Sequence, residues 1–245
     1  MKAAYDDHAS VYDQTYEAPI RRYVEGFTFN NLIGDVRGLS ILDVACGDGL
    51  YTRKLKRMGA ARILGVDLSE QMIEKARAKE ASEPIGVEYK VADVASIGRL
   101  GAFDLVTAIY LLHYAPTFEH LSAMCAALYE NLVPGGRLVT FVASPWYPER
   151  GRVDLPLYGF SVKIADPERD GSPGLLQFKY GSMELEVPFS RWKRETYEGC
   201  LRAAGFSNIT WGTPTLNPEG LEKLGAAYWE SYMQHPHFAF ITCSK

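Results

Sequence analysis

The sequence predicts a single α/β domain, built on a mostly parallel sheet with helices on both faces. Short apolar runs alternate with segments of helical spacing along most of the 245 residues, which is the pattern of a doubly wound sheet. Residues 103–109 are apolar on both faces, as a strand between two helical layers requires. A glycine-rich turn directly follows the first apolar run, and sheets of this kind bind ligands at such turns.

The individual elements are predicted from apolar spacing and from end signals. Gly59 is a typical residue just beyond a helix end, and Ser69 is a good N-cap with Glu70 in the first turn of the next helix. Pro218 suits the first position of a late helix, after Asn217 as its N-cap. The predicted strands are residues 40–45, 62–67, 87–91, 103–109, 137–143, 208–211 and 238–243, and the clearest helices are 50–58, 117–133 (stopped by the Pro-Gly-Gly at 134–136) and 197–204.

Two further segments are predicted to cover the ligand edge of the sheet. Residues 1–36 contain two helical stretches that can fold over this edge as a lid. Residues 145–190 are rich in Pro, Gly and aromatic residues, and they form a cap insertion in which the alternation at 175–187 indicates antiparallel strands. The first lid helix carries Tyr5, Tyr12 and Tyr16, and the second starts at Pro19 with Ile20, Tyr23, Val24 and Phe27 on one face.

Composition excludes several classes of protein. Lys and Arg number 26 against 30 Asp and Glu, so the basic excess that is usual in nucleic-acid-binding proteins is missing. The basic cluster at residues 53–57 is predicted to be a solvated helix face. Four widely spaced cysteines without a CxxC pair predict neither a metal site nor disulfides. Because the first ten residues are polar and no apolar run could span a bilayer, we expect a cytoplasmic protein without a membrane partner.

The strongest chemical signal is the turn Asp43-Val-Ala-Cys-Gly47-Asp-Gly49 between the first strand and its helix. Glycines there let the backbone approach a ligand closely, and the helix N-terminus presents free N–H groups to a negative group. Taken alone this signal is weak, because many strand-to-helix turns contain glycine. The turn therefore predicts a ligand site only together with polar residues at the ends of the neighbouring strands.

Carboxylates at the ends of the next two strands extend the pattern. Asp67 is placed to accept hydrogen bonds from both ribose hydroxyls of a nucleoside, although it also fits an ordinary helix cap. Asp93 is placed to accept a hydrogen bond from an adenine amino group, with the Val94 N–H free for a ring nitrogen. Met72 would pack on the adenine face or belong to the core. These positions predict a cofactor that contains adenosine.

Together these stretches resemble the class I S-adenosylmethionine-dependent methyltransferases, through ILDVACGDG, GVDLSEQM, VADV, FDLVTAIYLLHY and LVPGGRLV within residues 41–143. The family prefers Gly at the position of Ala45, so this chain departs mildly from the family pattern there. The resemblance implies S-adenosylmethionine as the cofactor and a seven-stranded Rossmann-like sheet of order 3-2-1-4-5-7-6 with an antiparallel seventh strand. The cofactor-binding residues that we predict are Tyr12, Arg21, Asp43, Ala45, Cys46, Gly47, Gly49, Asp67, Leu68, Met72, Asp93, Val94, Ala108 and Tyr110.

A nicotinamide-dependent dehydrogenase is the nearest alternative. Its GxGxxG fingerprint ends on a glycine that packs the helix against the strand. In this chain AxGxG is followed by Leu50 and Tyr51, so the third glycine is missing. The sequence therefore favours the methyltransferase.

The predicted methyl acceptor is a small molecule. Residues 108–114 read AIYLLHY, where methylases of nucleic-acid bases carry an Asn/Asp-Pro-Pro-aromatic motif, and no carboxylate cluster for a metal lies beyond them. A shaped pocket can supply much of the rate by positioning alone. We predict catalytic roles for His113, as a base or as an orienting partner, and for Tyr5 in positioning, although His113 also fits a structural histidine. The predicted substrate residues are Tyr5, His113, Tyr114 and Trp146, the last of which also fits the core of the insertion.

At a finer level the chain resembles toxoflavin synthase and its relatives, which N-methylate an azapteridine (pyrimidotriazine). The stretches concerned are YDDHASVYD at 5–13, RRYVEGFTF at 21–29 and residues 41–80, and the resemblance weakens through the insertion. It implies N-methylation of a small planar heterocycle in a secondary-metabolite pathway. The open alternatives are O- or C-methylation of another secondary metabolite, a methylase of protein or lipid with an open groove, and a non-catalytic S-adenosylmethionine-binding protein.

Overall fold

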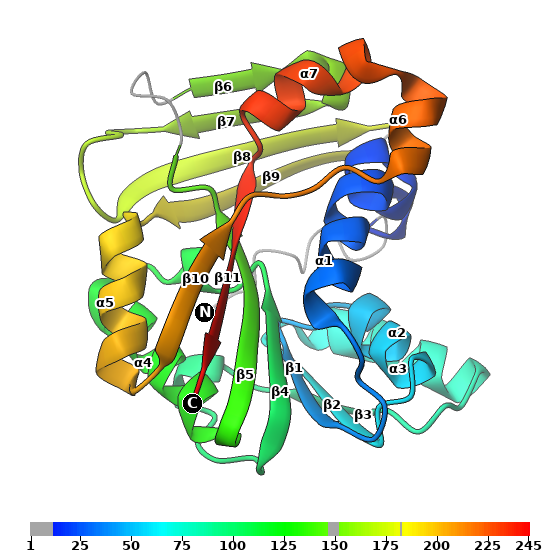
Figure 1. The fold of residues 1–245 in the computed structure, drawn as a ribbon, viewed down its shortest axis with the longest axis vertical. Helices are drawn as coiled ribbons and strands as arrows, with labels where there is room; N and C mark the ends of the chain where they lie inside the picture. Colours follow the sequence, from blue (N-terminus) through cyan, green and yellow to red (C-terminus); the bar gives the residue numbers. More distant parts are fainter. Residues whose placement is uncertain (1–11, 147–151, 182) are drawn as a thin grey trace.

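A main sheet of seven strands carries a second, four-stranded sheet at one end (Figure 1). The computed structural model describes residues 12–146, 152–181 and 183–245. Helices lie on both faces of the main sheet, which confirms the predicted fold class. Among these residues, no helix combines the length and the apolar character needed to cross a membrane.

The main sheet has the strand order β3-β2-β1-β4-β5-β11-β10. The first five strands in sequence run parallel, and β11 is antiparallel to both of its neighbours. The predicted order and the antiparallel seventh strand are therefore confirmed. β5 begins earlier than predicted, because residues 134–136 belong to the strand and shift its register against β4. The strands are β1 (Ser40–Val44), β2 (Arg62–Asp67), β3 (Glu88–Val91), β4 (Phe103–Ile109), β5 (Leu132–Ala143), β10 (Ser207–Gly212) and β11 (Phe238–Ser244).

Two apolar cores form because successive strand residues point to opposite faces. Ile41 packs in the core that contains Phe29 of α1 and Leu55 of α2. Leu42 packs in the other core, which contains Leu128 of α4 and residues of α5. The helices are α1 (Gly26–Ile33), α2 (Leu50–Arg57), α3 (Glu70–Ser82), α4 (Phe118–Glu130), α5 (Arg194–Ala204), α6 (Pro218–Leu224) and α7 (Ala226–Gln234), with short turns η2 (Tyr12–Glu17), η3 (Arg21–Glu25), η4 (Val94–Ser96), η5 (Leu112–Tyr114) and η6 (Pro156–Tyr158).

The second N-terminal helix contains a π-helical turn, η3, directly before α1. A π-turn holds one more residue than an α-turn and therefore rotates the helix faces that come after it. The predicted apolar face included Phe27, but Phe27 is only half-buried, whereas Phe29 is fully buried. The same turn places the charged side chain of Glu25 in the interior.

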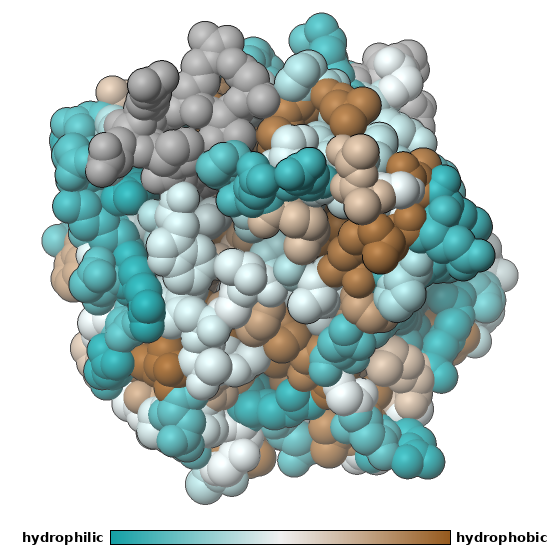
Figure 2. Space-filling view, turned by 45° about the horizontal axis from the view of Figure 1, so that its top comes forward, coloured by the Kyte–Doolittle hydropathy of each residue, from teal (hydrophilic) through white to brown (hydrophobic). Residues whose placement is uncertain are grey.

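The four-stranded sheet lies over the carboxyl ends of the parallel strands, as predicted for the insertion (Figure 1). Its strands pair antiparallel in sequence order and its inward side chains, such as Val162 and Val187, join the core that contains α1. With this side of the molecule turned forward, apolar residues form separate patches among polar ones (Figure 2). The strands are β6 (Arg152–Leu155), β7 (Phe160–Ile164), β8 (Ser172–Tyr180) and β9 (Met183–Arg191).

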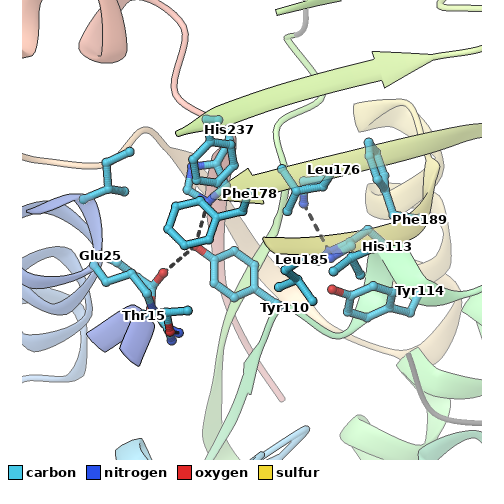
Figure 3. Close-up of a pocket in the computed structure, with 15 residues that line it drawn as sticks. Thr15, Glu25, Tyr110, His113, Tyr114, Leu176, Phe178, Leu185, Phe189 and His237 are labelled. Carbon is cyan, nitrogen blue, oxygen red and sulfur yellow. Dashed lines mark hydrogen bonds and ion pairs between the residues drawn. The ribbon is translucent and has the colours of Figure 1, made fainter. Parts of the chain in front are cut away.

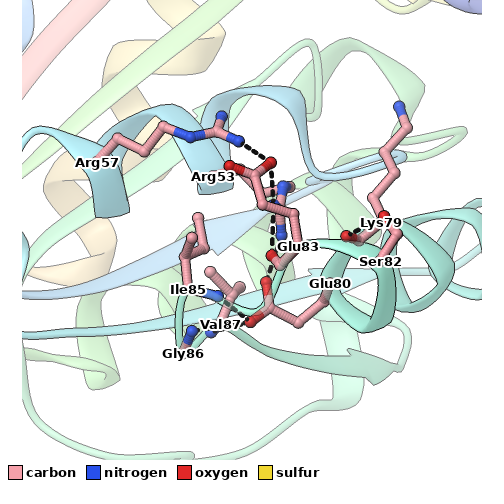
Figure 4. Close-up of polar contacts among 9 residues, drawn as sticks. All are labelled: Arg53, Arg57, Lys79, Glu80, Ser82, Glu83, Ile85, Gly86 and Val87. Atoms are coloured by element: carbon pink, nitrogen blue, oxygen red, sulfur yellow. Dashed lines mark hydrogen bonds and ion pairs between the residues drawn. The ribbon is translucent and has the colours of Figure 1, made fainter.

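One member of the basic cluster on α2 is not solvated as predicted. The Arg53 side chain is only 5% exposed and pairs with Glu80 of α3 and with Glu83 (Figure 4). Glu80 in turn accepts hydrogen bonds from the backbone N–H groups of residues 85–87, which precede β3. Burial alone would raise the pKa of Glu80, but these N–H groups and the Arg53 charge lower it. Arg53 therefore joins α2 to the α3–β3 connection.

Replacing Arg53 by Met is expected to lower the free energy of unfolding by about 3 kcal/mol, because it leaves Glu80 without its buried cation. Arg57 is the matched control, since it binds the same Glu83 with a side chain that is 51% exposed. Arg57→Met is expected to cost less than about 1 kcal/mol. Urea denaturation of both variants measures the difference, and equal effects would contradict the structural role of Arg53.

Candidate functional site

The carboxyl ends of β1, β2 and β4 and the residues after β3 surround a cavity of about 420 Å³. Its volume is typical of a site for a small molecule or cofactor. N-terminal residues close part of it, since Tyr16 of η2 and Arg21 of η3 also line it. The other described residues at its wall include Ala45, Cys46, Gly47, Asp48, Asp67, Leu68, Met72, Asp93, Val94, Tyr110 and Tyr114.

The turn after β1 adopts left-handed backbone conformations at three positions. Ala45 and Gly47 both have φ of 56°, and Gly49 has φ of 84°. Left-handed backbone is strained for residues with a side chain, so Ala45 carries strain that the two glycines avoid. A Cβ atom on Gly49 would collide with the hydroxyl oxygen of Tyr89. Gly49 thus allows tight packing beneath α2 and is not at the cavity wall.

Asp43 faces the interior and not the cavity. Its carboxylate accepts hydrogen bonds from the hydroxyls of Thr52 in α2 and Thr107 in β4, both at 2.6 Å. Burial raises the pKa of Asp43 to about 6, and the nearby charge of Asp67 adds to this. Asp43 therefore holds the first turns of α2 against the sheet.

Asp67 and Asp93 lie at the cavity wall as predicted. Asp67 accepts a hydrogen bond from the backbone N–H of Gly47 through one oxygen and from that of Ser69 through the other, both at 2.8 Å. Asp93 caps η4 by accepting from the N–H of Ala95 at 3.0 Å. These contacts fix the orientation of both carboxylates at the cavity wall.

A second, smaller cavity of about 80 Å³ lies between the main sheet and the cap (Figure 3). Arg21, Tyr110 and Tyr114 line both cavities, so the two are neighbours across these side chains. Most of the remaining wall is apolar and comes from the cap strands. It is formed by Phe160, Leu176, Phe178, Leu185, Val187 and Phe189 together with Thr15, Ile20, Glu25, His113, Ala143 and His237.

His113 is held as a neutral hydrogen-bond donor toward this cavity. Its Nδ1 accepts a hydrogen bond from the backbone N–H of Ala143 at 3.2 Å, so the ring proton resides on Nε2. Burial lowers the pKa of His113 to about 3. A group with so low a pKa is a weak proton acceptor near neutral pH. The geometry thus favours the orienting role of His113 over the role of base.

A buried polar network that the sequence did not predict lies at the wall between the cavities. Glu25 accepts hydrogen bonds from the hydroxyls of Tyr51 (2.7 Å) and Tyr110 (2.9 Å). The Tyr110 hydroxyl also lies 3.2 Å from Nε2 of His237, whose Nδ1 is 2.9 Å from the hydroxyl of Tyr232. Glu25 belongs to the stretch 21–29 that carries the finer resemblance, but a glutamate in a helix usually indicates a solvated face.

The predicted site residues divide into four groups. Ten of the predicted cofactor residues line the larger cavity, and His113 and Tyr114 line the smaller one. Asp43, Gly49 and Ala108 lie behind the wall of the larger cavity. Trp146 is 46% exposed and packs edge-to-face on Trp211, outside both cavities. Tyr5 and the side chain of Tyr12 lie outside the described residues.

Residues 41–136 match a protein family described as a methyltransferase domain. The chain is 33% identical over 106 residues to the ubiquinone biosynthesis O-methyltransferase of Xanthomonas oryzae pv. oryzae, a stretch that covers 42% of this chain and 43% of that protein. A 104-residue stretch of the Coxiella burnetii protein of the same name is also 33% identical and likewise spans 43% of its length. The match thus covers less than half of these curated relatives.

Solved structures match over nearly the whole chain. An S-adenosylmethionine dependent methyltransferase from Mesorhizobium loti has a TM-score of 0.66 at 20% identity and covers 94% of this chain and 99% of the other. The DhpI-SAM-HEP complex has a TM-score of 0.63 at 20% identity and covers 98% of this chain and 94% of the other. At this identity the likeness shows the fold, which is the Rossmann-like fold of these methyltransferases.

Proposed function

We propose that this chain, which has the Rossmann-like methyltransferase fold and a matching methyltransferase domain, is an S-adenosylmethionine-dependent methyltransferase acting on a small planar molecule. One observation carries the proposal: two cavities meet at Arg21, Tyr110 and Tyr114. A methyl donor in the larger cavity and an acceptor in the smaller one would meet where these three side chains border both cavities. Such positioning is what an in-line methyl transfer requires.

The larger cavity fits S-adenosylmethionine in its polar groups and its walls. The Asp67 carboxylate at the cavity wall is suited to accept from the two ribose hydroxyls, and Asp93 is suited to the adenine amino group. Met72 and Leu68 offer apolar surface to the adenine ring. When bound, the cofactor would supply an electrophilic methyl group, and the chain's part is to hold it toward the smaller cavity.

The lining of the smaller cavity suits a flat aromatic group. Its aromatic and aliphatic walls favour a planar ring, and the Nε2–H of His113 gives one fixed hydrogen bond to orient it. A small cavity beneath the four-stranded cap argues against the open groove that a protein or lipid substrate would need. Its presence beside the cofactor cavity also argues against a purely non-catalytic binding protein.

N-methylation of a pyrimidotriazine, as in toxoflavin synthase, is our first candidate reaction. It is supported by the resemblance at residues 21–29, which contribute Arg21 and Glu25 to the smaller cavity. O-methylation is the second candidate, because the curated relatives are named ubiquinone O-methyltransferases. The family match, however, ends at residue 136, before the cap that lines the acceptor cavity begins.

Isothermal titration with S-adenosylhomocysteine, followed by titration of the loaded protein with didemethylated toxoflavin or with catechol, tests the proposal. We expect the cofactor product to bind first and an acceptor to bind only to the loaded protein. Mass spectrometry after incubation with S-adenosylmethionine then shows whether nitrogen or oxygen is methylated. A folded protein that does not bind S-adenosylhomocysteine would contradict the proposed function.

A further inference from the structure

We infer that Glu25 takes up the proton that the methyl acceptor loses, through the hydroxyl of Tyr110, and that the smaller cavity therefore binds aromatic molecules with a neutral N–H or O–H group. This inference rests on the proposed function and deepens it, because it defines the chemical class of the acceptor. It assigns to Glu25, Tyr110 and His237 a role that the cofactor-binding pattern does not contain.

Glu25 is held firmly at the wall between the two cavities. Its side chain is buried in η3, one carboxylate oxygen accepts from Tyr51 and the other from Tyr110, and Arg21 lies 3.3 Å away as a counter-charge. Figure 3 shows Glu25, Tyr110 and His237 together on one side of the smaller cavity, with His113 on the other. A carboxylate with these partners costs desolvation to bury, and such buried charges are often found at functional sites.

The hydrogen bonds around Tyr110 have only one consistent direction. A carboxylate can only accept, so the single proton of the Tyr110 hydroxyl points to Glu25. His237 must then donate its Nε2–H to the Tyr110 oxygen, and its Nδ1 accepts from Tyr232. The tautomer of His237 is thus assigned from its partners. The Tyr110 oxygen keeps one lone pair for a donor in the cavity, and His237 acts as a positioning residue.

The proton transfer balances without any further reactant. The acceptor's N–H or O–H proton moves to the Tyr110 oxygen while the Tyr110 proton moves to Glu25. When bound, S-adenosylmethionine supplies the methyl group, whose carbon bonds to the acceptor's lone pair while its bond to sulfur breaks and leaves the electron pair on sulfur. Burial and the charge of Glu25 raise the pKa of Tyr110 well above its ordinary value, so the tyrosine passes a proton on without remaining ionised.

The change in charge during this step explains why a buried carboxylate at position 25 would assist the transfer. The Glu25 carboxylate, the Arg21 guanidinium and a sulfonium carry charge before the transfer, and only Arg21 carries charge after it. The transfer thus removes one pair of opposite charges from a buried site, where each charge is poorly solvated. The acceptor itself should enter uncharged, with its N–H or O–H toward Tyr110 and a lone pair toward the Nε2–H of His113.

Binding of 4-nitrophenol to the protein loaded with S-adenosylhomocysteine tests this inference without turnover, because the phenol and the phenolate absorb at different wavelengths. A negative Glu25 disfavours the bound phenolate. In Glu25→Gln, the ratio of bound phenolate to bound phenol at one pH is expected to rise at least about tenfold. Glu17→Gln is the matched control: this glutamate lies in the same N-terminal segment with a side chain that is 73% exposed, and the ratio is expected to stay as in the wild type.

Tyr110→Phe provides a second measurement should Glu25→Gln fail to fold. The loaded wild type is expected to bind 4-nitrophenol about tenfold more tightly than 4-nitroanisole, which has no O–H, and Tyr110→Phe should remove most of that preference. Any one of three results would overturn the inference. The phenolate ratio could stay unchanged in Glu25→Gln, or the preference for 4-nitrophenol could stay unchanged in Tyr110→Phe. The third result is that 4-nitrophenol does not bind to the loaded wild type. Titration with S-adenosylhomocysteine separates the two proposals, since only its failure counts against the proposed function.

Discussion

Asp67→Ala is expected to weaken the binding of S-adenosylhomocysteine by at least about 100-fold. Asp67 lies at the wall of the larger cavity, where backbone N–H groups hold both of its oxygens. Two hydrogen bonds from ribose hydroxyls to a carboxylate contribute about 1.5 to 3 kcal/mol each, so their joint loss amounts to about 3 kcal/mol or more. Isothermal titration of the wild type and the variant measures the change.

Glu70→Ala is the matched control for Asp67. Glu70 is an exposed carboxylate in the first turn of α3, three positions further along the chain. Its replacement should leave the affinity within about twofold, since it has no place at the cavity wall. Asp93→Ala should fall between the two, because one hydrogen bond to adenine corresponds to about tenfold. If Asp67→Ala and Glu70→Ala bound equally well, the assignment of the ribose site would be wrong.

The protein is expected to lose stability steeply as the pH falls from 6.5 to 4.5. Burial lowers the pKa of both His113 and His237 to about 3, and the charge of Arg21 contributes for His237. Below pH 6.5 the unfolded chain binds protons at these imidazoles, while the folded chain does not. Each imidazole therefore lowers the free energy of unfolding by about 2.7 kcal/mol at pH 4.5. Asp43 opposes this, because its raised pKa makes the folded chain bind a proton first as the pH falls below 6. The net loss at pH 4.5 is about 3 kcal/mol.

Two variants separate these contributions in urea denaturation as a function of pH. His113→Asn keeps an acceptor for the Ala143 N–H and should reduce the loss between pH 6.5 and 4.5 by about 2.7 kcal/mol. Asp43→Asn removes the opposing contribution and should make the loss steeper. His235→Asn changes an exposed histidine and should leave the profile unchanged. A His113→Asn profile like that of the wild type would show that this imidazole is protonated in the folded state.

Local signals predicted the elements around the larger cavity well. The limits of β2 and β4, the N-caps at Ser69 and Asn217 and the residues at the carboxyl ends of β1 to β3 are determined by apolar spacing and turn chemistry within a few neighbours. Local signals do not determine the orientation of Asp43, because its partner Thr107 is 64 residues away in the sequence. A carboxylate in the glycine-rich turn carries the same local signal whether it faces a ligand or the sheet.

The smaller cavity and the cap above it were predictable only in outline. Glu25 enters the cavity because of the π-turn η3, and nothing in a single sequence distinguishes such a turn from an α-helix. The partners Tyr51, Tyr110 and His237 come from distant elements, so the network exists only in the folded chain. Composition indicates the cap as an insertion, but its four strands pair through contacts that local composition does not determine.

The position of β11 in the main sheet also determines which of the two cavities forms first during folding. β11 lies between β5 and β10, and Ser244 pairs with Arg137, so the whole cap lies in the loop that this pairing closes. Pairing between residues so far apart in sequence is slow to form, whereas the β1–α2–β2–α3–β3 units join near neighbours. We therefore expect the strands around the larger cavity to assemble first, and the smaller cavity to take shape only after β11 has inserted.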